Sequence, residues 1–236
     1  MKCVILAGGR GTRLSELTNK IPKPMVKING KPIIVHIINH FKKFGIKDFI
    51  IAAGYKKEVI KRYFRNSSSK SYNVKVIDTG LHTMTGGRIK RLKKYLLKES
   101  FFMTYGDGLS TVNINKLYEF HKRHKKIASL TAVRPPARFG ALKISSKKVV
   151  TYFKEKSALD EGWVNGGFFV LNPKIFKYIK NDQTFFEREP LQKVSKLKSL
   201  FAYKHKGFWQ CMDTLRDKEI LEKKLKEFKK NELQKL

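Results

Sequence analysis

The sequence of 236 residues has few cysteines, few acidic residues and no long hydrophobic run. Its two cysteines, Cys3 and Cys211, are too few for the disulfide framework that stabilises small secreted domains. No run approaches the roughly 20 apolar residues that span a membrane, so membrane insertion is not expected. The chain enters an apolar run at residue 3, which leaves no stretch typical of a signal or transit peptide. We therefore expect a cytoplasmic protein.

Acidic residues are outnumbered by basic ones, 19 to 52, which gives a formal net charge of +33. A charge of this size attracts polyanions, including nucleic acids and anionic membrane surfaces. The lysines, however, are spread over nearly every expected helix and loop, without the aromatic-interleaved stripe typical of a nucleic-acid interface. We favour a lysine-rich surface that steers anionic substrates, and no dedicated nucleic-acid partner. Apolar residues make up 41%, enough to form a core.

The first 25 residues contain the pattern around which the rest of the chain is organised. Residues 3–7 (CVILA) form an apolar run typical of a buried strand in a parallel sheet. Gly8, Gly9 and Gly11 follow it immediately. Closely spaced glycines allow backbone N–H groups to approach an anion more closely than side chains would permit. The sequence therefore predicts a phosphate-binding loop after the first strand.

Two cations accompany this loop. Arg13 can offer a bidentate contact to a phosphate. Lys23 lies between Pro22 and Pro24, so its ammonium is presented by backbone that is already stiff. The glycine spacing matches neither the P-loop pattern nor the dinucleotide fingerprint that opens a helix.

The chain up to residue 133 alternates between strand and helix patterns. These stretches are expected at residues 3–7, 33–44, 49–53, 59–64, 74–78, 101–105, 114–124 and 127–133. The order predicts an α/β fold with a Rossmann-like, mixed, mostly parallel sheet flanked by helices. In such sheets ligands bind beyond the carboxyl ends of the strands, where the glycine loop would lie.

Beyond residue 133 the pattern changes to short strands and loops. Strand-like stretches at 140–142, 149–153 and 166–171 are framed by helical stretches near 173–180 and 188–197. We expect one domain over residues 1–236. Its parts would be a nucleotide-binding half (1–133), a small β-rich sugar-phosphate-binding half (134–212) and a C-terminal helix (213–236).

Three further features are candidates for function, each with a structural alternative. Asp107 lies between two glycines directly after a strand, where its hard oxygens suit a divalent metal ion, although Asp-Gly pairs commonly form plain turns. Gly86 and Gly87 stand at a helix start and would allow close approach of a ring or phosphate, or simply form a loop. Asp213 can be read as the cap of the final helix. The six histidines show no metal-ligand spacing.

These motifs resemble those of the sugar-phosphate nucleotidyltransferase family. Its signature L-A-G-G-x-G-T-R-L…K-P-K-P-M is matched from Leu6 to Leu14 and again, in part, at residues 22–25 (PKPM). The resemblance is closest to the glucose-1-phosphate cytidylyltransferases within the family and covers almost the whole chain. Its further matches lie at residues 79–80, 83–88, 105–108, 138–142, 165–170, 189–191 and 208–218.

The resemblance implies that CTP and a sugar 1-phosphate, with glucose 1-phosphate as the first candidate, condense to a CDP-sugar and pyrophosphate for surface polysaccharide precursors. It implies Mg²⁺ as the cofactor, held by Asp107 and Asp213, and a homo-oligomer. The catalytic residues would be Arg13, Lys23 and Asp107. The nucleotide contacts would be Leu6, Ala7, Gly8, Gly9, Gly11, Thr12, Thr85, Gly86 and Arg88. The sugar-phosphate contacts would be Gly140, Glu155, Lys156, Asn165 and Gly166.

Two departures from the family pattern leave the acceptor and the oligomer contacts open. Ser157 follows Lys156 where the family usually has the proline of its E-K-P motif, and the segment between Phe64 and Val74 is short for a glucose-specific enzyme. The alternatives are an enzyme of the same fold that uses another nucleoside triphosphate or acceptor, a basic nucleic-acid-binding protein, and a non-catalytic homologue. Retention of the charged site residues favours an enzyme.

Overall fold

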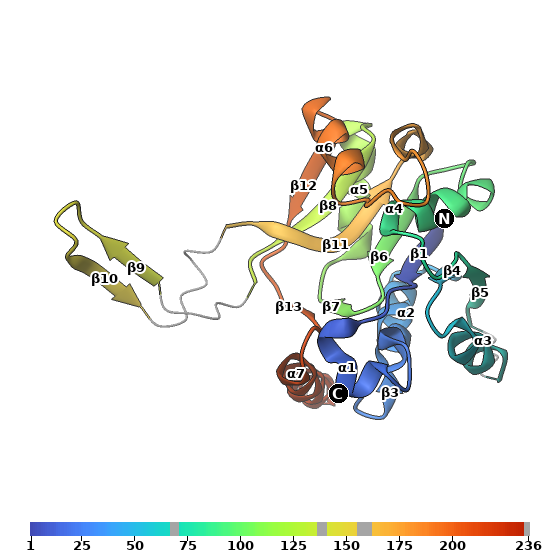
Figure 1. The fold of residues 1–236 in the computed structure, drawn as a ribbon, viewed down its shortest axis with the longest axis horizontal. Coiled ribbons are helices and arrows are strands. Elements are labelled where there is room, and N and C mark those ends of the chain that lie inside the picture. Colours follow the sequence, from blue (N-terminus) through green and yellow to red (C-terminus); the bar gives the residue numbers. More distant parts are fainter. Residues whose placement is uncertain (67–70, 136–140, 155–161, 234–236) are drawn as a thin grey trace.

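A seven-stranded sheet lies at the centre of the protein, in the strand order β12-β8-β11-β6-β1-β4-β5. The computed structural model describes residues 1–66, 71–135, 141–154 and 162–233 (Figure 1). β11 is antiparallel to both of its neighbours, and all other neighbouring pairs in this sheet are parallel. The expected mixed, mostly parallel sheet is therefore confirmed. Its strands are β1 (Lys2–Ala7), β4 (Asp48–Ala53), β5 (Asn73–Asp78), β6 (Phe101–Tyr105), β8 (Ala128–Val133), β11 (Val164–Leu171) and β12 (Leu200–Lys204).

Helices pack on both faces of the sheet because side chains alternate between the faces along each strand. In β1, Cys3, Ile5 and Ala7 belong to one hydrophobic cluster, whereas Val4 and Leu6 belong to the other. The first cluster also contains side chains of α2, α3, α5 and α7, and the second contains side chains of α4 and α6. The helices are α1 (Ser15–Thr18), α2 (Ile33–Lys43), α3 (Lys57–Asn66), α4 (Thr85–Arg91), α5 (Ile114–His124), α6 (Glu189–Lys196) and α7 (Leu215–Leu233).

The part of the chain beyond residue 133 contributes to this same core. β11 lies between β6 and β8, with Phe168 in the first cluster and Phe169 in the second. β12 adds an edge strand that we did not predict, although four of its five residues (LFAYK) are apolar or aromatic; three of the five are half-buried and two are exposed. The stretch expected to be helical near 173–180 is the 3₁₀ segment η4 (Pro173–Tyr178).

Short pairings complete the fold. The ladder of β7 with β13 joins residues that are about a hundred positions apart in the sequence, and the hairpin of β9 and β10 stands away from the central sheet (Figure 1). Within the described residues no helix combines the length and apolar character needed to cross a membrane. The short strands and 3₁₀ segments are β2 (Lys27–Ile28), β3 (Lys31–Pro32), β7 (Gly108–Ser110), β9 (Ala141–Ile144), β10 (Val150–Lys154), β13 (Trp209–Cys211), η1 (Thr12–Leu14), η2 (Lys23–Met25) and η3 (Lys93–Tyr95).

Candidate active site

The glycine loop after β1 packs directly against the segment of Lys23. Gly11 has a φ of 67°, in the left-handed region that favours glycine. A Cβ at this position would lie 3.0 Å from both the Cβ of Lys23 and the Cγ2 of Thr18. Gly11 is therefore required both for the turn and for the close approach of the two segments.

The Lys23 segment is a 3₁₀ turn, η2, in which the amide of Met25 donates to the carbonyl of Pro22 at 2.8 Å. It also touches the end of β6, because a Cβ on Gly106 would come within 3.0 Å of Pro24. The stiff, proline-flanked backbone holds Lys23 in place, and its side chain is only 10% exposed.

Four charged side chains converge at this point and form what we call the charge cluster: Arg13, Lys23, Asp107 and Asp213. The Nζ of Lys23 donates to the Oδ2 of Asp107 at 2.7 Å and to the Oδ1 of Asp213 at 2.8 Å. The Nη1 of Arg13 donates to the Oδ2 of Asp213 at 2.8 Å. The sequence predicted Arg13 and Lys23 as phosphate contacts and Asp107 as a metal ligand, the family resemblance added Asp213, and the structure places the four together.

Burial and pairing oppose each other in the charge cluster. Burial lowers the pKa of Lys23, but the two carboxylates outweigh it and hold that pKa above its usual value. Burial likewise would raise the pKa of Asp213, whereas Lys23 and Arg13 hold it below its usual value. Lys23 and Asp213 are therefore both charged at neutral pH. Burial and the nearby aspartates raise the pKa of Cys211 to about 12, so this neighbour remains a thiol.

The two aspartates are brought together by the ladder between β7 and β13. In it Gly108 pairs with Cys211, so the residues just outside the ladder, Asp107 and Met212, also face each other. The amide of Met212 donates to the carbonyl of Asp107 at 2.8 Å. This register places the Asp213 carboxylate beside that of Asp107.

Asp213 does not cap the final helix, and the interpretation as a cap is wrong. Thr214 and Asp217 form the cap instead: the amide of Asp217 donates to the Oγ1 of Thr214 at 3.2 Å, and the amide of Thr214 donates to Asp217 at 2.9 Å. The Oδ2 of Asp217 also accepts from the amide of Asp213 at 3.0 Å. The buried Asp217 thus fixes the backbone of Asp213. We did not predict Asp217 from the sequence, although the spacing T-x-x-D from Thr214 to Asp217 is typical of a capping box.

A cavity of about 330 Å³ opens beside the charge cluster, within the size range of small-molecule sites. Most of the residues predicted to contact the nucleotide line it, as do Arg13, Lys23 and Asp107. Its described lining residues are Leu6, Ala7, Gly8, Gly9, Gly11, Thr12, Arg13, Lys23, Pro24, Thr83, Met84, Thr85, Arg88, Tyr105, Gly106, Asp107 and Phe185.

Arg88 borders the cavity, but its guanidinium is buried and bonded to the protein. It donates to the carbonyls of Gly8 at 3.0 Å and Gly80 at 2.7 Å, and to the Oγ1 of Thr79 at 2.8 Å. A Cβ on Gly8 would lie 2.0 Å from its Nη1. Arg88 therefore connects the loops that follow β1 and β5. It stabilises the glycine loop, and any influence on a bound nucleotide would act through that loop.

Other segments of the protein pack closely against two glycines that we predicted as ligand contacts. A Cβ on Gly86 would lie 2.7 Å from the carbonyl oxygen of Thr184, and one on Gly166 would lie 2.9 Å from that of Thr131. Neither glycine is among the described residues that line the cavity. Both positions need a residue without a side chain because other segments pack against them, and their contact with a ligand stays a prediction.

The predicted sugar-phosphate contacts are described only in part. Gly140, Glu155 and Lys156 lie outside the described residues. Asn165 is exposed, with its Nδ2 3.5 Å from the hydroxyl of Tyr105. Tyr105 in turn donates to Glu187, a residue that sequence reasoning missed because a single glutamate in a polar turn has no recognisable pattern.

Comparisons with known proteins identify the family of this chain. The family model described as nucleotidyl transferase matches residues 2–215. The chain belongs to the nucleotidyl transferase family. It is 49% identical to a glucose-1-phosphate cytidylyltransferase of Salmonella typhi, covering 94% of this chain and 95% of that protein. A probable glucose-1-phosphate cytidylyltransferase of Bacillus subtilis is 40% identical, over 92% and 93% of the two chains. The crystal structure of HddC from Yersinia pseudotuberculosis complexed with GMP-PN superimposes with a TM-score of 0.76 and 27% identity, over 95% of this chain and 99% of that one.

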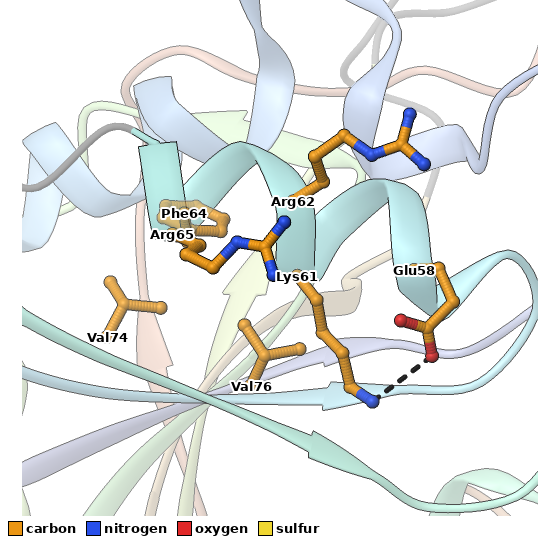
Figure 2. A pocket seen from close by; sticks show the side chains of 7 residues that line it. All are labelled: Glu58, Lys61, Arg62, Phe64, Arg65, Val74 and Val76. Carbon is orange, nitrogen blue, oxygen red and sulfur yellow. Dashed lines mark hydrogen bonds and ion pairs between the residues drawn. The ribbon is translucent and has the colours of Figure 1, made fainter.

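This nucleotidyl transferase has a second, larger cavity of about 430 Å³ between α3 and β5. Figure 2 shows Lys61 and Arg65 near its floor of Val74 and Val76. The only carboxylate in its described lining is that of Glu58, which already accepts a 3.1 Å hydrogen bond from Lys61. Without a second carboxylate or a glycine loop, this cavity lacks the chemistry of the site beside β1.

Proposed function

We propose that this protein transfers the cytidylyl group of CTP to glucose 1-phosphate, giving CDP-glucose and pyrophosphate. The observation that supports the reaction class most directly is the charge cluster at the edge of the glycine-lined cavity, since two cations and two carboxylates suit a triphosphate and its metal. The choice of substrates follows the names of the relatives from Salmonella typhi and Bacillus subtilis.

In the proposed reaction an oxygen of the sugar phosphate attacks the α-phosphorus of CTP. A new P–O bond forms, the bond from the α-phosphorus to the bridging oxygen breaks, and pyrophosphate leaves with the electron pair. Little proton transfer is needed, so positioning and charge stabilisation dominate the rate. Lys23 and Arg13 stabilise the negative charge of the phosphates. To do so, each exchanges an aspartate partner for a phosphate oxygen.

The aspartates of the charge cluster fit a divalent cation. Asp107 Oδ2 and Asp213 Oδ1 both lie within 2.8 Å of one ammonium, so they already share a cation. Carboxylate oxygens are the ligands that Mg²⁺ prefers. Asp107 and Asp213 would therefore hold Mg²⁺, which supplies neutralisation of phosphate charge when it is bound.

A grid of nucleotides and acceptors tests the proposal. CTP, UTP, GTP and ATP are each incubated with glucose 1-phosphate, mannose 1-phosphate and non-sugar phosphates in the presence of Mg²⁺, and pyrophosphate release is measured. The highest kcat/KM is expected for CTP with glucose 1-phosphate. Another preferred pair would correct the substrates but keep the reaction class. No release from any pair, together with salt-sensitive retention on DNA, would favour a nucleic-acid-binding protein.

A homo-oligomer and a cytoplasmic location are further parts of this proposal. Light scattering of the purified protein tests the first, because a monomer has a mass of 27.4 kDa. A mass that stays at this value over the working concentration range would reject the oligomer.

A further inference from the structure

Glu187 is an acidic residue in a strongly basic chain, and hydroxyl groups hold its carboxylate. The hydroxyl of Tyr105 donates to its Oε1 at 2.6 Å, and the Oγ1 of Thr85 donates to its Oε2 at 2.6 Å. Both distances are typical of hydrogen bonds to an ionised carboxylate. Because hydroxyl donors orient a carboxylate without neutralising it, Glu187 presents a negative charge in a fixed position.

The two hydroxyls come from different walls of the cavity. Thr85 is the first residue of α4 and Tyr105 is the last residue of β6, and both line the cavity together with Phe185. The segment before Glu187 is anchored to the same wall, since the amide of Phe186 donates to the Oγ1 of Thr85 at 2.9 Å. Glu187 is therefore held at the side of the cavity by two of its walls.

The same network leads to the predicted sugar contact. The Nδ2 of Asn165 lies 3.5 Å from the hydroxyl of Tyr105, which donates to Glu187. Burial, together with the Glu187 carboxylate, raises the pKa of Tyr105 well above its usual value, so this phenol keeps its proton and remains a donor. Tyr105, which lines the cavity, thus connects Glu187 to Asn165.

The charge of Glu187 restricts what it can contact in a substrate. A carboxylate repels the phosphates of both substrates, whereas it accepts hydrogen bonds from neutral hydroxyl groups. Each of its oxygens accepts one bond from the protein and has further acceptor capacity. Its side chain is only partly buried, so a ligand can reach it. The complementary groups are the hydroxyls of a sugar ring.

We infer that Glu187 is a specificity-determining residue that accepts a hydrogen bond from a ring hydroxyl of the acceptor sugar phosphate. This inference rests on the proposed function. Tyr105 and Thr85 orient the carboxylate, and the carboxylate selects acceptors that have a hydroxyl at the matching position. Acceptors without that hydroxyl leave the charged oxygen without its partner and react more slowly.

Deoxy analogues of the acceptor test the contact. With CTP and Mg²⁺, kcat/KM is measured for glucose 1-phosphate and for its 2-, 3-, 4- and 6-deoxy analogues, first in the wild type. Wild type is expected to disfavour at least one analogue by about 10- to 100-fold, the range for a hydrogen bond to a charged group. Glu187→Gln is then expected to lose a similar factor with glucose 1-phosphate and little with that analogue, while KM for CTP is unchanged.

The matched control is Glu189→Gln, which removes the same charge two residues away. Glu189 pairs with Lys180 at 2.9 Å and Lys193 at 2.8 Å, whereas Glu187 accepts from the hydroxyls of Tyr105 and Thr85. Glu189→Gln should leave the acceptor preference unchanged. Circular dichroism checks that Glu187→Gln folds. If it does not, Glu187→Asp allows the same comparison, because its side chain is one methylene shorter and keeps the carboxylate.

Three results would overturn the inference. An equal loss for all acceptors would make Glu187 purely structural, and full retention of the wild-type discrimination would remove it from the sugar site. A changed preference between CTP and UTP with an unchanged acceptor preference would place it at the base. Failure of the proposed function looks different, because the wild type itself would then release no pyrophosphate with any pair, and the inference would fall with it.

Discussion

The ammonium of Lys23 donates a 2.8 Å hydrogen bond to Asp213 across 190 residues of sequence. It donates a second bond to Asp107, and Arg13 covers the other oxygen of Asp213. Two positive and two negative groups therefore balance each other in a partly buried position. The site holds its charged groups in place without a substrate, and in the proposed reaction substrate binding would exchange their partners without creating new unpaired charges.

We expect Asp107→Asn to abolish pyrophosphate release while the fold is retained. The substitution keeps the shape of the side chain but removes the charge proposed to hold the metal, so we expect a loss of at least about 10³-fold in kcat. Activity assays and circular dichroism check this. Asp48→Asn is the control, since Asp48 is exposed at the start of β4. Near wild-type turnover in Asp107→Asn would remove the metal assignment.

Lys23→Met should reduce both stability and activity. Two carboxylates would be left close together without their shared partner, a situation that typically costs about 3 kcal/mol at such buried positions. Urea unfolding measures the loss in free energy of unfolding, and Lys27→Met, which replaces an exposed lysine, is the control.

Lys23→Met should also change how the free energy of unfolding depends on pH in the acid range. Lys23 helps to hold the pKa of Asp213 below its usual value, so that carboxylate stabilises the fold above its unfolded pKa and loses this effect as the pH falls through the folded pKa. In Lys23→Met the pKa of Asp213 should rise toward its unfolded value, so this carboxyl should contribute less acid destabilisation and stability should fall less steeply in acid. An unchanged dependence of stability on pH in the acid range would contradict this role of Lys23.

Gly8→Ala and Gly9→Ala should differ sharply in stability although the residues are adjacent. A Cβ on Gly8 would overlap the guanidinium of Arg88, at 2.0 Å from its Nη1, whereas a Cβ on Gly9 has no described atom within 4 Å. We expect Gly8→Ala to lose about 1–3 kcal/mol, the usual range for overpacking, and Gly9→Ala to lose little. Thermal unfolding of the two variants makes the comparison, and equal midpoints would contradict it.

The buried His121 and the half-buried His40 should make the protein less stable in mild acid. Burial lowers the pKa of His40 and of His121 to about 4, from an ordinary value near 6.5. The unfolded chain therefore binds more protons, so this contribution is complete above pH 6.5 and is lost as the pH falls toward 4. Each group adds a slope of up to about 1.4 kcal/mol per pH unit in that window. Urea unfolding between pH 7.5 and 4.5 measures it, and His40→Gln and His121→Gln should each flatten the slope.

Asp217→Asn should impair catalysis from outside the cavity. Asp217 accepts from Gln210 and from the amides of Asp213 and Thr214, and it is 5% exposed. Loss of its charge weakens these bonds and frees the backbone that orients Asp213. We expect about 10-fold lower kcat and a lower unfolding midpoint. Arg216→Gln, a neighbouring exposed charge, is the control; unchanged kcat in Asp217→Asn would show that the orientation of Asp213 does not depend on it.

The central elements could be predicted from local pattern because their signals lie within short windows. The run 3–7 followed by Gly8 and Gly9 indicates a buried strand and an anion loop, and the apolar spacing over 33–44 indicates a helix. Asp107 could be selected because its glycine neighbours and its strand end are adjacent in sequence.

Other parts of the site depend on contacts between distant segments, which no short window contains. Gly86 packs against Thr184, 98 positions away, and Gly166 packs against Thr131, 35 positions away. The sequence therefore does not distinguish a glycine that makes room for a ligand from one that makes room for another segment. Glu187 acquires its significance only from Tyr105 and Thr85.

By itself the sequence determined the fold class, the glycine loop and the site residues Arg13, Lys23 and Asp107, because periodicity and motif spacing are local properties, whereas Asp213 was indicated by the family resemblance alone. Only the tertiary structure decided how the charges pair. The ladder of β7 with β13 closes the long loop between Asp107 and Asp213, and the cap formed by Thr214 and Asp217 leaves Asp213 free to meet Lys23. Chain closure of this kind is set by packing of the whole sheet, which is why the pairing of these charges was not visible in the order of residues.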